Sequence, residues 1–241
     1  MKKATPEQRE DEKCEKNFFT RKFVLMAQSL QIMKGMKCME NKIICIGREY
    51  GSGGREIGEK LARQLGIPCY DKLLIKKAAL ESGLSEEFLS RTEESPINSI
   101  QFLSGNPYAD VAGIGTAFYS ESQMAYNAER TVIEQLAKQG PCVIIGRCAS
   151  AILPKEDRLS VFIYADKADK IKRVMARNNL TEKEAAHRIK HMDRMRKQFF
   201  DFYSDTSWGH ADSYDLLLSS SRFGTDGCVN MIVNSIKEWE A

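Results

Sequence analysis

Short apolar runs alternate with stretches of helical periodicity along most of the chain. The first clear run, at 42–47, is rich in β-branched residues and ends in a glycine. The residues that follow the next glycines, 55–65, place apolar side chains at the spacing of one helix face. This change of period predicts a strand, a loop and a helix in succession.

The same alternation continues toward the C-terminus. Further short strands are predicted at 67–71, 142–146, 160–165 and 214–220. Helices such as 128–139 and 168–178 separate them. Strands that are buried on both faces and joined by helices form parallel sheets with right-handed crossovers. We therefore expect an α/β fold in three layers, with an open parallel sheet of about five strands flanked by helices.

Three regions depart from this alternation. Residues 80–126 contain loop signals and no clear strand, which predicts a helical insert. Residues 170–197 are strongly basic, and their plain interpretation is a pair of solvated helices. The segment 1–40 mixes charges with short apolar groups and is expected to be a helical or disordered extension, or alternatively a partner-binding helix. The domain proper is then 41–241.

Composition narrows the class of protein. The 36 Lys and Arg residues against 33 acidic residues give a net charge of +3, which argues against a general nucleic-acid binder. Seven cysteines with no C-x-x-C pair indicate a reducing compartment. No apolar run approaches the roughly 18 residues of a membrane-spanning helix. A cytoplasmic protein without membrane or nucleic-acid partners is expected, and the sequence leaves its oligomeric state open.

A glycine-rich turn joins the first predicted strand to its helix. The turn contains Gly51-Ser52-Gly53-Gly54. Glycines let successive backbone N–H groups converge on phosphate oxygens, and the positive end of the helix dipole favours the same anion. The alternative is a tight turn of purely structural use. The pattern predicts a phosphate-binding loop.

This turn departs from the P-loop pattern G-x-x-x-x-G-K-[ST]. Arg48, Gly54 and Arg55 stand where that pattern has Gly, Lys, and Ser or Thr. Either Arg55 or Arg48 could supply the missing cation, since phosphoryl transfer depends mainly on positioning and charge neutralisation. The alternative is that transfer activity has been lost. Ser52 is the nearby hydroxyl that could bind Mg²⁺.

Several ordered blocks add a family resemblance from about residue 42 to the C-terminus. They are the turn from Gly47 to Gly58, Tyr70-Asp71-Lys72, Val143-Ile144-Ile145-Gly146-Arg147, Val161-Phe162-Ile163-Tyr164, Asp193-Arg194-Met195-Arg196, and Trp208 with Tyr214-Asp215-Leu216. Together they resemble the cytidylate kinase-like family of P-loop nucleoside-monophosphate kinases. The resemblance implies ATP and Mg²⁺ as cofactors, a nucleotide acceptor such as CMP or dCMP, and a mobile lid near residues 173–196.

The resemblance also implies roles for individual residues. Arg147 follows a strand, where α/β folds bind ligands, and the resemblance implies that it binds the acceptor; the alternative is that it forms a structural salt bridge. Cys148 replaces the aspartate that follows this arginine in cytidylate kinases. The donor nucleotide would be bound by Gly51, Ser52, Gly53, Gly54, Arg55, Glu56, Arg173 and Arg177. The acceptor would be bound by Asp71, Lys77, Arg130, Arg147, Arg188, Asp193 and Arg196. The catalytic cations would be Arg55, Arg48 and Arg196.

The leading hypothesis is a kinase that moves the terminal phosphoryl group of ATP to CMP or dCMP. Because the P-loop lysine is missing, a non-catalytic nucleotide-binding regulatory module is an alternative. Because Cys148 replaces that aspartate, a second alternative is a kinase for a different small phosphorylated acceptor. His187 and His191 share a helix face but lack further ligands at zinc spacing. The aromatic residues at 199–203 are expected to pack on the sheet rather than to stack on nucleic-acid bases.

Overall fold

The computed structural model describes residues 42–71, 77 and 114–239 of the 241-residue chain. The predicted extension at 1–40 lies outside these residues, as does most of the predicted insert at 80–126. The account below concerns the described part of the chain.

A five-stranded sheet forms the centre of the fold, and all of its pairings are parallel. The strands are β1 (Ile43–Arg48), β2 (Cys69–Tyr70), β3 (Cys142–Ile145), β4 (Arg158–Tyr164) and β5 (Leu216–Ser219). Their order is β2-β3-β1-β4-β5, so β1 lies in the middle with β3 and β4 on either side. The expected parallel sheet is confirmed. Its central strands end along one edge, where α/β folds place their ligands.

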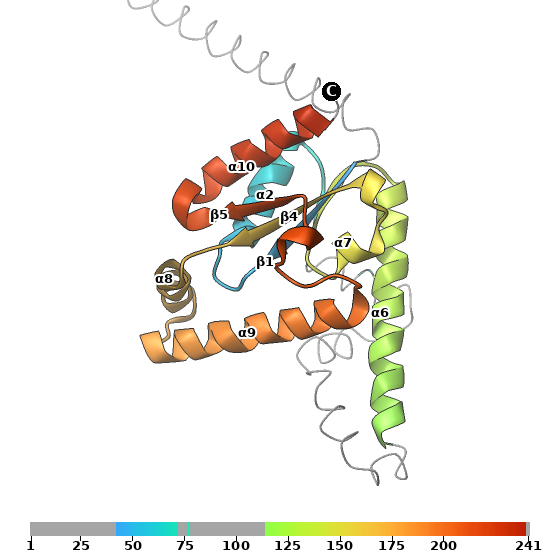
Figure 1. Cartoon of the computed structure of the whole chain (residues 1–241), viewed down its shortest axis with the longest axis horizontal. Coiled ribbons are helices and arrows are strands. Elements are labelled where there is room, and N and C mark those ends of the chain that lie inside the picture. Colours follow the sequence, from blue (N-terminus) through green and yellow to red (C-terminus); the bar gives the residue numbers. More distant parts are fainter. Residues whose placement is uncertain (1–41, 72–76, 78–113, 240–241) are drawn as a thin grey trace, which may run out of the picture.

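Helices cover both faces of the sheet (Figure 1). On one face, α2 (Gly54–Leu65) and α10 (Ser220–Trp239) contribute apolar side chains such as Ile57, Leu61 and Ile232. On the other, α6 (Ile114–Lys138) and α7 (Ala149–Ile152) contribute Ile133 and Leu136 among others. Burying β-branched strands between two helical layers accounts for the hydrophobic runs in the sequence. Three layers result, as the pattern predicted.

The basic region forms two helices, α8 (Lys167–Asn178) and α9 (Glu182–Tyr203). They pack together through Val174, Ala185 and Ile189. Thr181 begins α9 with a capping box, in which its hydroxyl accepts the Glu184 N–H and the Glu184 carboxylate accepts the Thr181 N–H. These helices have a structural face as well as a solvated one. The prediction of a merely solvated pair was therefore incomplete.

The C-terminal end of α9 carries the aromatic residues. Phe200 is buried against Phe162 of β4 and Tyr214, and Tyr203 stacks on Tyr126 with ring centroids 3.8 Å apart. Phe202 is 41% exposed. Packing of this aromatic cluster against the domain is confirmed for Phe200, whereas Phe202 does not take part in the core.

Several predicted boundaries differ from the structure. The strand expected at 67–71 is limited to Cys69–Tyr70, and the one expected at 160–165 begins at Arg158. The strand expected at 214–220 begins only at Leu216, because Asp215 uses its carboxylate to accept hydrogen bonds from the backbone and hydroxyl of Ser160. The helix expected at 128–139 is the second half of α6, which starts at Ile114. Residues 114–126 therefore belong to a long helix rather than to a separate insert. The short helices η2 (Lys155–Asp157) and η3 (Ala211–Ser213) precede β4 and β5.

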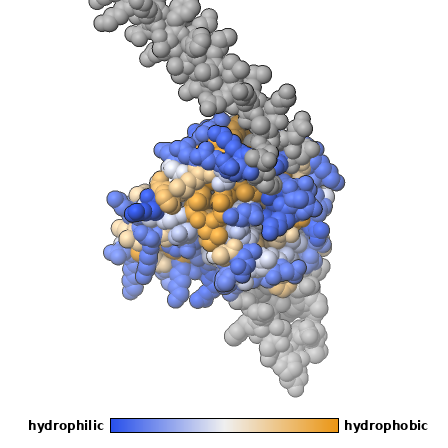
Figure 2. Space-filling view, turned by 45° about the horizontal axis from the view of Figure 1, so that its top comes forward, coloured by the Kyte–Doolittle hydropathy of each residue, from blue (hydrophilic) through white to orange (hydrophobic). Residues whose placement is uncertain are grey.

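The face in Figure 2 is mostly hydrophilic, with one apolar area near its centre. Over the described residues, the large hydrophobic side chains that remain exposed are Met124, Tyr164, Phe202, Leu217 and Phe223. Leu217 lies on β5, an edge strand of the sheet. None of the helices in the described ranges is both long and apolar enough to cross a bilayer.

Candidate active site

The glycine-rich turn leads from β1 into α2. Gly51 and Gly53 have φ values of +83° and +80°, a conformation that side chains disfavour. Gly53 is the N-cap residue, and α2 begins at Gly54. Ser52 is fully buried; its hydroxyl donates to the Glu49 carbonyl over 2.9 Å and accepts the Gly54 N–H. The turn is thus held from inside, next to the positive end of a 12-residue helix.

Side chains from α8 and α9 hold the outside of this turn. Asp193 of α9 accepts the Tyr50 N–H over 2.6 Å. Lys170 of α8 lies 3.0 Å from the Glu49 carboxylate and 3.5 Å from that of Asp193. Burial raises the pKa of Asp193, while the Tyr50 N–H and the Lys170 ammonium act in the opposite direction. The turn and the two helices are therefore joined by a small ionic network.

Arg173 of α8 contributes to the same junction. Its Nη1 donates to the Gly51 carbonyl and to the Ser220 hydroxyl, each over 3.3 Å. The Ser220 hydroxyl in turn donates to the Ser52 carbonyl over 2.6 Å. Arg177 is exposed, and its guanidinium carbon lies 4.9 Å from the centre of the Tyr50 ring. In this structure Arg173 contacts the backbone of the turn, whereas Arg177 lies over its aromatic side chain.

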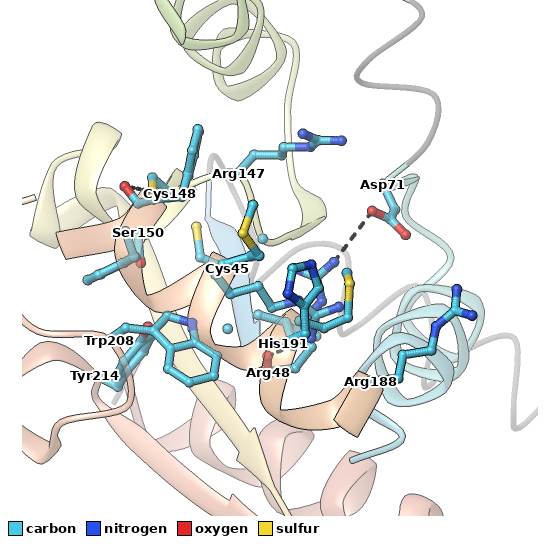
Figure 3. Close-up of a pocket in the computed structure, with 18 of the residues that line it drawn as sticks. Cys45, Arg48, Asp71, Arg147, Cys148, Ser150, Arg188, His191, Trp208 and Tyr214 are labelled. Atoms are coloured by element: carbon cyan, nitrogen blue, oxygen red, sulfur yellow. Dashed lines mark hydrogen bonds and ion pairs between the residues drawn. The ribbon is translucent and has the colours of Figure 1, made fainter. Parts of the chain in front are cut away.

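Arg48 ends β1 and points into the adjoining cleft. Its side chain is 19% exposed, and Nη2 lies 3.7 Å from the Asp71 carboxylate (Figure 3). Burial lowers the pKa of Arg48, and Asp71 opposes this shift. The backbone carbonyl of Arg48 accepts a hydrogen bond of 3.0 Å from Nη1 of Arg196. Arg48 is thus held at both its backbone and its side chain.

Arg147 follows β3 on a strained turn. Gly146, Arg147 and Cys148 have φ values of +80°, +57° and +52°. Left-handed residues other than glycine are uncommon, and such strain gathers at functional sites. Glu129 of α6 is 6% exposed at its side chain, and its Oε1 lies 3.1 Å from Nη1 of Arg147. The structural contact with an acidic partner that the sequence left open for Arg147 is present, with the pKa of Glu129 raised by burial to about 8, and Arg147 also lines the cleft.

Three buried guanidinium groups gather beside the glycine-rich turn. Burial lowers the pKa of Arg147 to about 10 and that of Arg196 to about 9, and in both cases the charge of Arg48 adds to the shift. All three side chains remain cationic at neutral pH. Repulsion among them is relieved when an anion binds between them. This is the electrostatic character expected of a phosphate site.

The cleft has a volume of about 990 Å³. Its polar lining comprises Arg48, Asp71, Arg147, Ser150, His187, Arg188, His191 and Arg196. Its apolar wall includes Cys45, Cys148, Met192, Met195, Phe199, Phe200, Trp208 and Tyr214. Among the side chains labelled in Figure 3, Arg48 and Arg147 come from strand ends, Arg188 and His191 from α9, and Trp208 and Tyr214 from the segment before β5. The site can hold a molecule that has both an anionic and an apolar part.

The structure gathers some of the predicted residues and separates others. Arg48, Asp71, Arg147, Arg188 and Arg196 line the cleft. Arg130 is 56% exposed at its side chain and pairs with Glu134, away from the cleft lining. Lys77 is half-buried and is not among the lining residues of the described chain. Asp193 was predicted to bind the acceptor, but in the structure its carboxylate already accepts the Tyr50 N–H of the turn.

The predicted donor side lies around the turn itself. Arg55 is 48% exposed at its side chain, with Nε 2.9 Å from Glu59 and 3.5 Å from Asp71. Glu56 pairs with Lys60 and accepts a bond from Thr225. Ser52, the predicted Mg²⁺ ligand, directs its hydroxyl to the backbone of the turn. Within the described ranges, no group of three or more His, Cys, Asp or Glu side chains could hold a metal ion.

Several residues of the site were not predicted. Lys170 and Glu129 hold Asp193 and Arg147, but charged residues on helices give no sequence signal of such partners. His187 and His191, considered only for zinc, line the cleft beside Arg188. Their i, i+4 spacing indicated a shared helix face, and that signal could have placed them here.

A family model described as the cytidylate kinase-like family matches residues 43–222. The chain belongs to the cytidylate kinase-like family. A cytidylate kinase from Methanococcus vannielii is 28% identical over 106 residues, which are 43% of this chain and 61% of that enzyme. The match thus spans less than two thirds of that relative. The family match confirms the resemblance to the cytidylate kinase-like family that the ordered sequence blocks indicated.

Solved structures extend the comparison for this cytidylate kinase-like protein. An uncharacterized protein from Eubacterium ventriosum is 30% identical, with a TM-score of 0.60, and the match covers 81% of this chain and 98% of that one. A shikimate kinase from Acinetobacter baumannii, solved with shikimate, is 14% identical with a TM-score of 0.43 over 82% of this chain and 93% of that one. The chain has a kinase-like nucleotide phosphotransferase fold.

Proposed function

We propose that this protein transfers the terminal phosphoryl group of MgATP to a small phosphorylated acceptor, with CMP and dCMP as the first candidates. Family membership supports a nucleotide or small-molecule kinase. The observation that carries the proposal is the convergence of Arg48, Arg147 and Arg196 on one cleft beside the glycine-rich turn. These side chains come from β1, from the end of β3 and from α9.

The turn and the arginines would divide the work between two phosphate groups. Backbone N–H groups at Gly53 and Gly54, with the dipole of α2, suit the phosphates of the donor. Arg147 and Arg196 line the same cleft and would bind the acceptor phosphate. The acceptor oxygen is itself the nucleophile in such a transfer, so neither a covalent enzyme intermediate nor a strong general base is needed. Positioning and charge neutralisation carry the rate enhancement.

Mg²⁺ enters this reaction as part of the substrate MgATP. It would bridge phosphate oxygens and neutralise their charge. Ser52 is the predicted protein ligand, but its buried hydroxyl is already donated to Glu49. A metal ion would bind the lone pairs of this oxygen, so Ser52 could keep that donated bond, but the residue is fully buried and its oxygen already accepts the Gly54 N–H. We therefore assign the phosphates, rather than this hydroxyl, the main share of the metal's coordination.

Cys148 bears on which base the acceptor carries. The thiol is 5% exposed at the residue level and lies 3.9 Å from the Phe199 carbonyl. Burial raises the pKa of Cys148, so the group stays neutral. A thiol accepts hydrogen bonds weakly and cannot replace a carboxylate that reads an amino group. This observation favours the second candidate, a kinase whose small phosphorylated acceptor is not a cytosine nucleotide.

ADP release by the purified protein tests the proposal. ATP and Mg²⁺ are supplied with a panel of nucleoside monophosphates that includes CMP and dCMP. Gly53→Val serves as the blank, because a β-branched residue at φ +80° strains the turn. We expect turnover with CMP or dCMP. Turnover only with another acceptor would support the second candidate, and ATP binding without any turnover would support the non-catalytic regulatory module.

A further inference from the structure

Two departures from the P-loop pattern occupy adjoining space. Arg48 stands where the pattern has its first glycine, and Gly54 stands where it has lysine. A Cβ atom added to Gly54 would lie 2.6 Å from the Cβ of Arg48 and 3.2 Å from its Cγ. Real Cβ atoms essentially never approach so closely. In this backbone, a side chain at position 54 and the arginine at position 48 exclude each other.

The backbone permits a side chain at position 48. Among the described residues that are not glycine, a positive φ occurs at Arg147, Cys148 and Asn179, so Arg48 is free of that strain. The first stem atoms of Arg48 occupy the space in which a side chain at position 54 would begin. From there the side chain reaches Gly146 and Asp71 at the floor of the cleft. Compared with the P-loop pattern, this chain thus has its cation at the end of the strand rather than in the first turn of the helix.

We propose that Arg48 is the catalytic cation of this protein, in the place of the P-loop lysine, and that Arg48 and Gly54 form one exchanged pair. The proposal rests on the phosphotransferase function proposed above. Arg48 would contact the phosphoryl group in transit between the turn and Arg196. Its planar guanidinium can bind two phosphate oxygens at once, whereas a lysine acts as a point charge.

Arg55, the other cation of the turn, fits this role less well. Its side chain is 48% exposed and is engaged by Glu59 one helical turn later. Arg48 is 19% exposed, and Arg196 fixes its backbone carbonyl. A buried cation in a water-poor site stabilises a developing charge more than an exposed one does. Arg55 is therefore the rival cation with which Arg48 is compared.

The test is a double-mutant cycle of the full chain with Arg48→Gly, Gly54→Lys and the double variant. Phosphoryl transfer and the Kd for MgATP are measured for each. We expect Arg48→Gly to lower kcat on the order of a hundredfold. Gly54→Lys alone should also impair transfer, because its stem displaces Arg48. The double variant should recover at least about tenfold over the better single variant. Arg55→Ala, which removes the rival cation of the turn, should lower kcat by much less than Arg48→Gly does.

A second cycle keeps the test independent of folding defects and of catalysis. Gly54→Ala adds only the Cβ atom, so it should lower the thermal unfolding midpoint when Arg48 is present. In an Arg48→Gly background the same substitution should lower the midpoint by less, because the 3.2 Å contact with the Cβ of Ile163 is then the tight one that remains and alanine favours helices over glycine. Equal effects in the two backgrounds would overturn the exclusion of positions 48 and 54.

The outcomes separate this proposal from the proposed function. A wild-type protein that binds MgATP but transfers no phosphoryl group contradicts the function, and the cycle is then scored on the Kd for MgATP alone. A wild-type protein that does transfer, while Arg48→Gly is harmless or the double variant shows no recovery, contradicts the role of Arg48 and leaves the function standing. Failure of the wild type to bind MgATP overturns both.

Discussion

The Arg48 guanidinium lies directly against the backbone of Gly146. A Cβ atom at position 146 would overlap Nη1 of Arg48 and would lie 2.9 Å from its Cζ. Gly146 also has a φ of +80°. The end of β3 thus leaves room for a cation that comes from the end of β1, and the two neighbouring strands together shape the floor of the cleft.

Gly146→Ala should therefore displace Arg48 and reduce phosphoryl transfer on the order of tenfold or more. Gly140→Ala is the matched control, because Gly140 has a positive φ of +128° but no atom within 4 Å of an added Cβ. Both variants carry backbone strain on the order of 1–3 kcal/mol, and only the first should change kcat. Similar kinetics in the two variants would show that contact with Arg48 is unimportant.

Asp193→Ala should destabilise the turn. The substitution leaves the Tyr50 N–H and the Lys170 ammonium without the Asp193 carboxylate, at a cost of about 1–3 kcal/mol in the free energy of unfolding. The affinity for MgATP should fall as well, because the loop loses its preorganisation. Asp226→Ala, which removes an 82% exposed partner of Lys60, should change stability by less than about 0.5 kcal/mol. Denaturant unfolding and calorimetric titration measure both quantities.

Glu129 gives a pH-dependent prediction. Burial raises its pKa to about 8, from 4.5 in the unfolded chain. The folded protein then holds a proton that the unfolded chain releases, so the free energy of unfolding falls as pH rises from about 5 to 8. Each pKa unit corresponds to about 1.4 kcal/mol.

The matched variant Glu129→Gln lacks this titration but keeps an acceptor for Arg147. We expect the stability of the wild type, relative to Glu129→Gln, to decrease through that window and to level off above pH 8. A relative stability that rises with pH would mean that the Arg147 guanidinium, 3.1 Å away, dominates over burial.

Arg173 and Arg177 should separate in their effects. Arg173→Ala removes two hydrogen bonds to the turn and its neighbour, which should lower the free energy of unfolding by about 1–2 kcal/mol. Arg177→Ala should leave stability within about 0.5 kcal/mol, because that side chain is exposed. If Arg177 binds the donor nucleotide, as the family resemblance implies, its removal should weaken MgATP binding about tenfold, or about 1.4 kcal/mol. Unchanged MgATP affinity in Arg177→Ala would remove it from the donor site.

The sequence predicted the parts of the site that follow from strand ends. Arg48 and Arg147 come directly after buried apolar runs, and carboxyl ends of neighbouring parallel strands meet at one edge. The glycine-rich turn was predicted because glycines let backbone N–H groups converge on an anion, and the structure adds that Gly51 and Gly53 need a positive φ. Local pattern and topology were enough here.

Pairings between distant helices and loops could not be predicted in the same way. The bond from Tyr50 to Asp193 spans 143 residues, and helical periodicity does not say which loop a helix faces. The resemblance implied an acceptor role for Arg130, but its guanidinium pairs with Glu134 one turn later on α6. The steric conflict between Arg48 and a side chain at position 54 could be recognised only from the distance between their Cβ positions in the structure.

Direct detection of the product tests the central claim. ³¹P NMR of ATP, Mg²⁺ and CMP with the wild-type protein should show CDP and ADP forming in equal amounts, with neither product forming above background in Gly53→Val. If CMP fails, the same experiment with other small phosphorylated acceptors should reveal one that is converted. A folded protein that binds MgATP and converts none of them would contradict the phosphotransferase account.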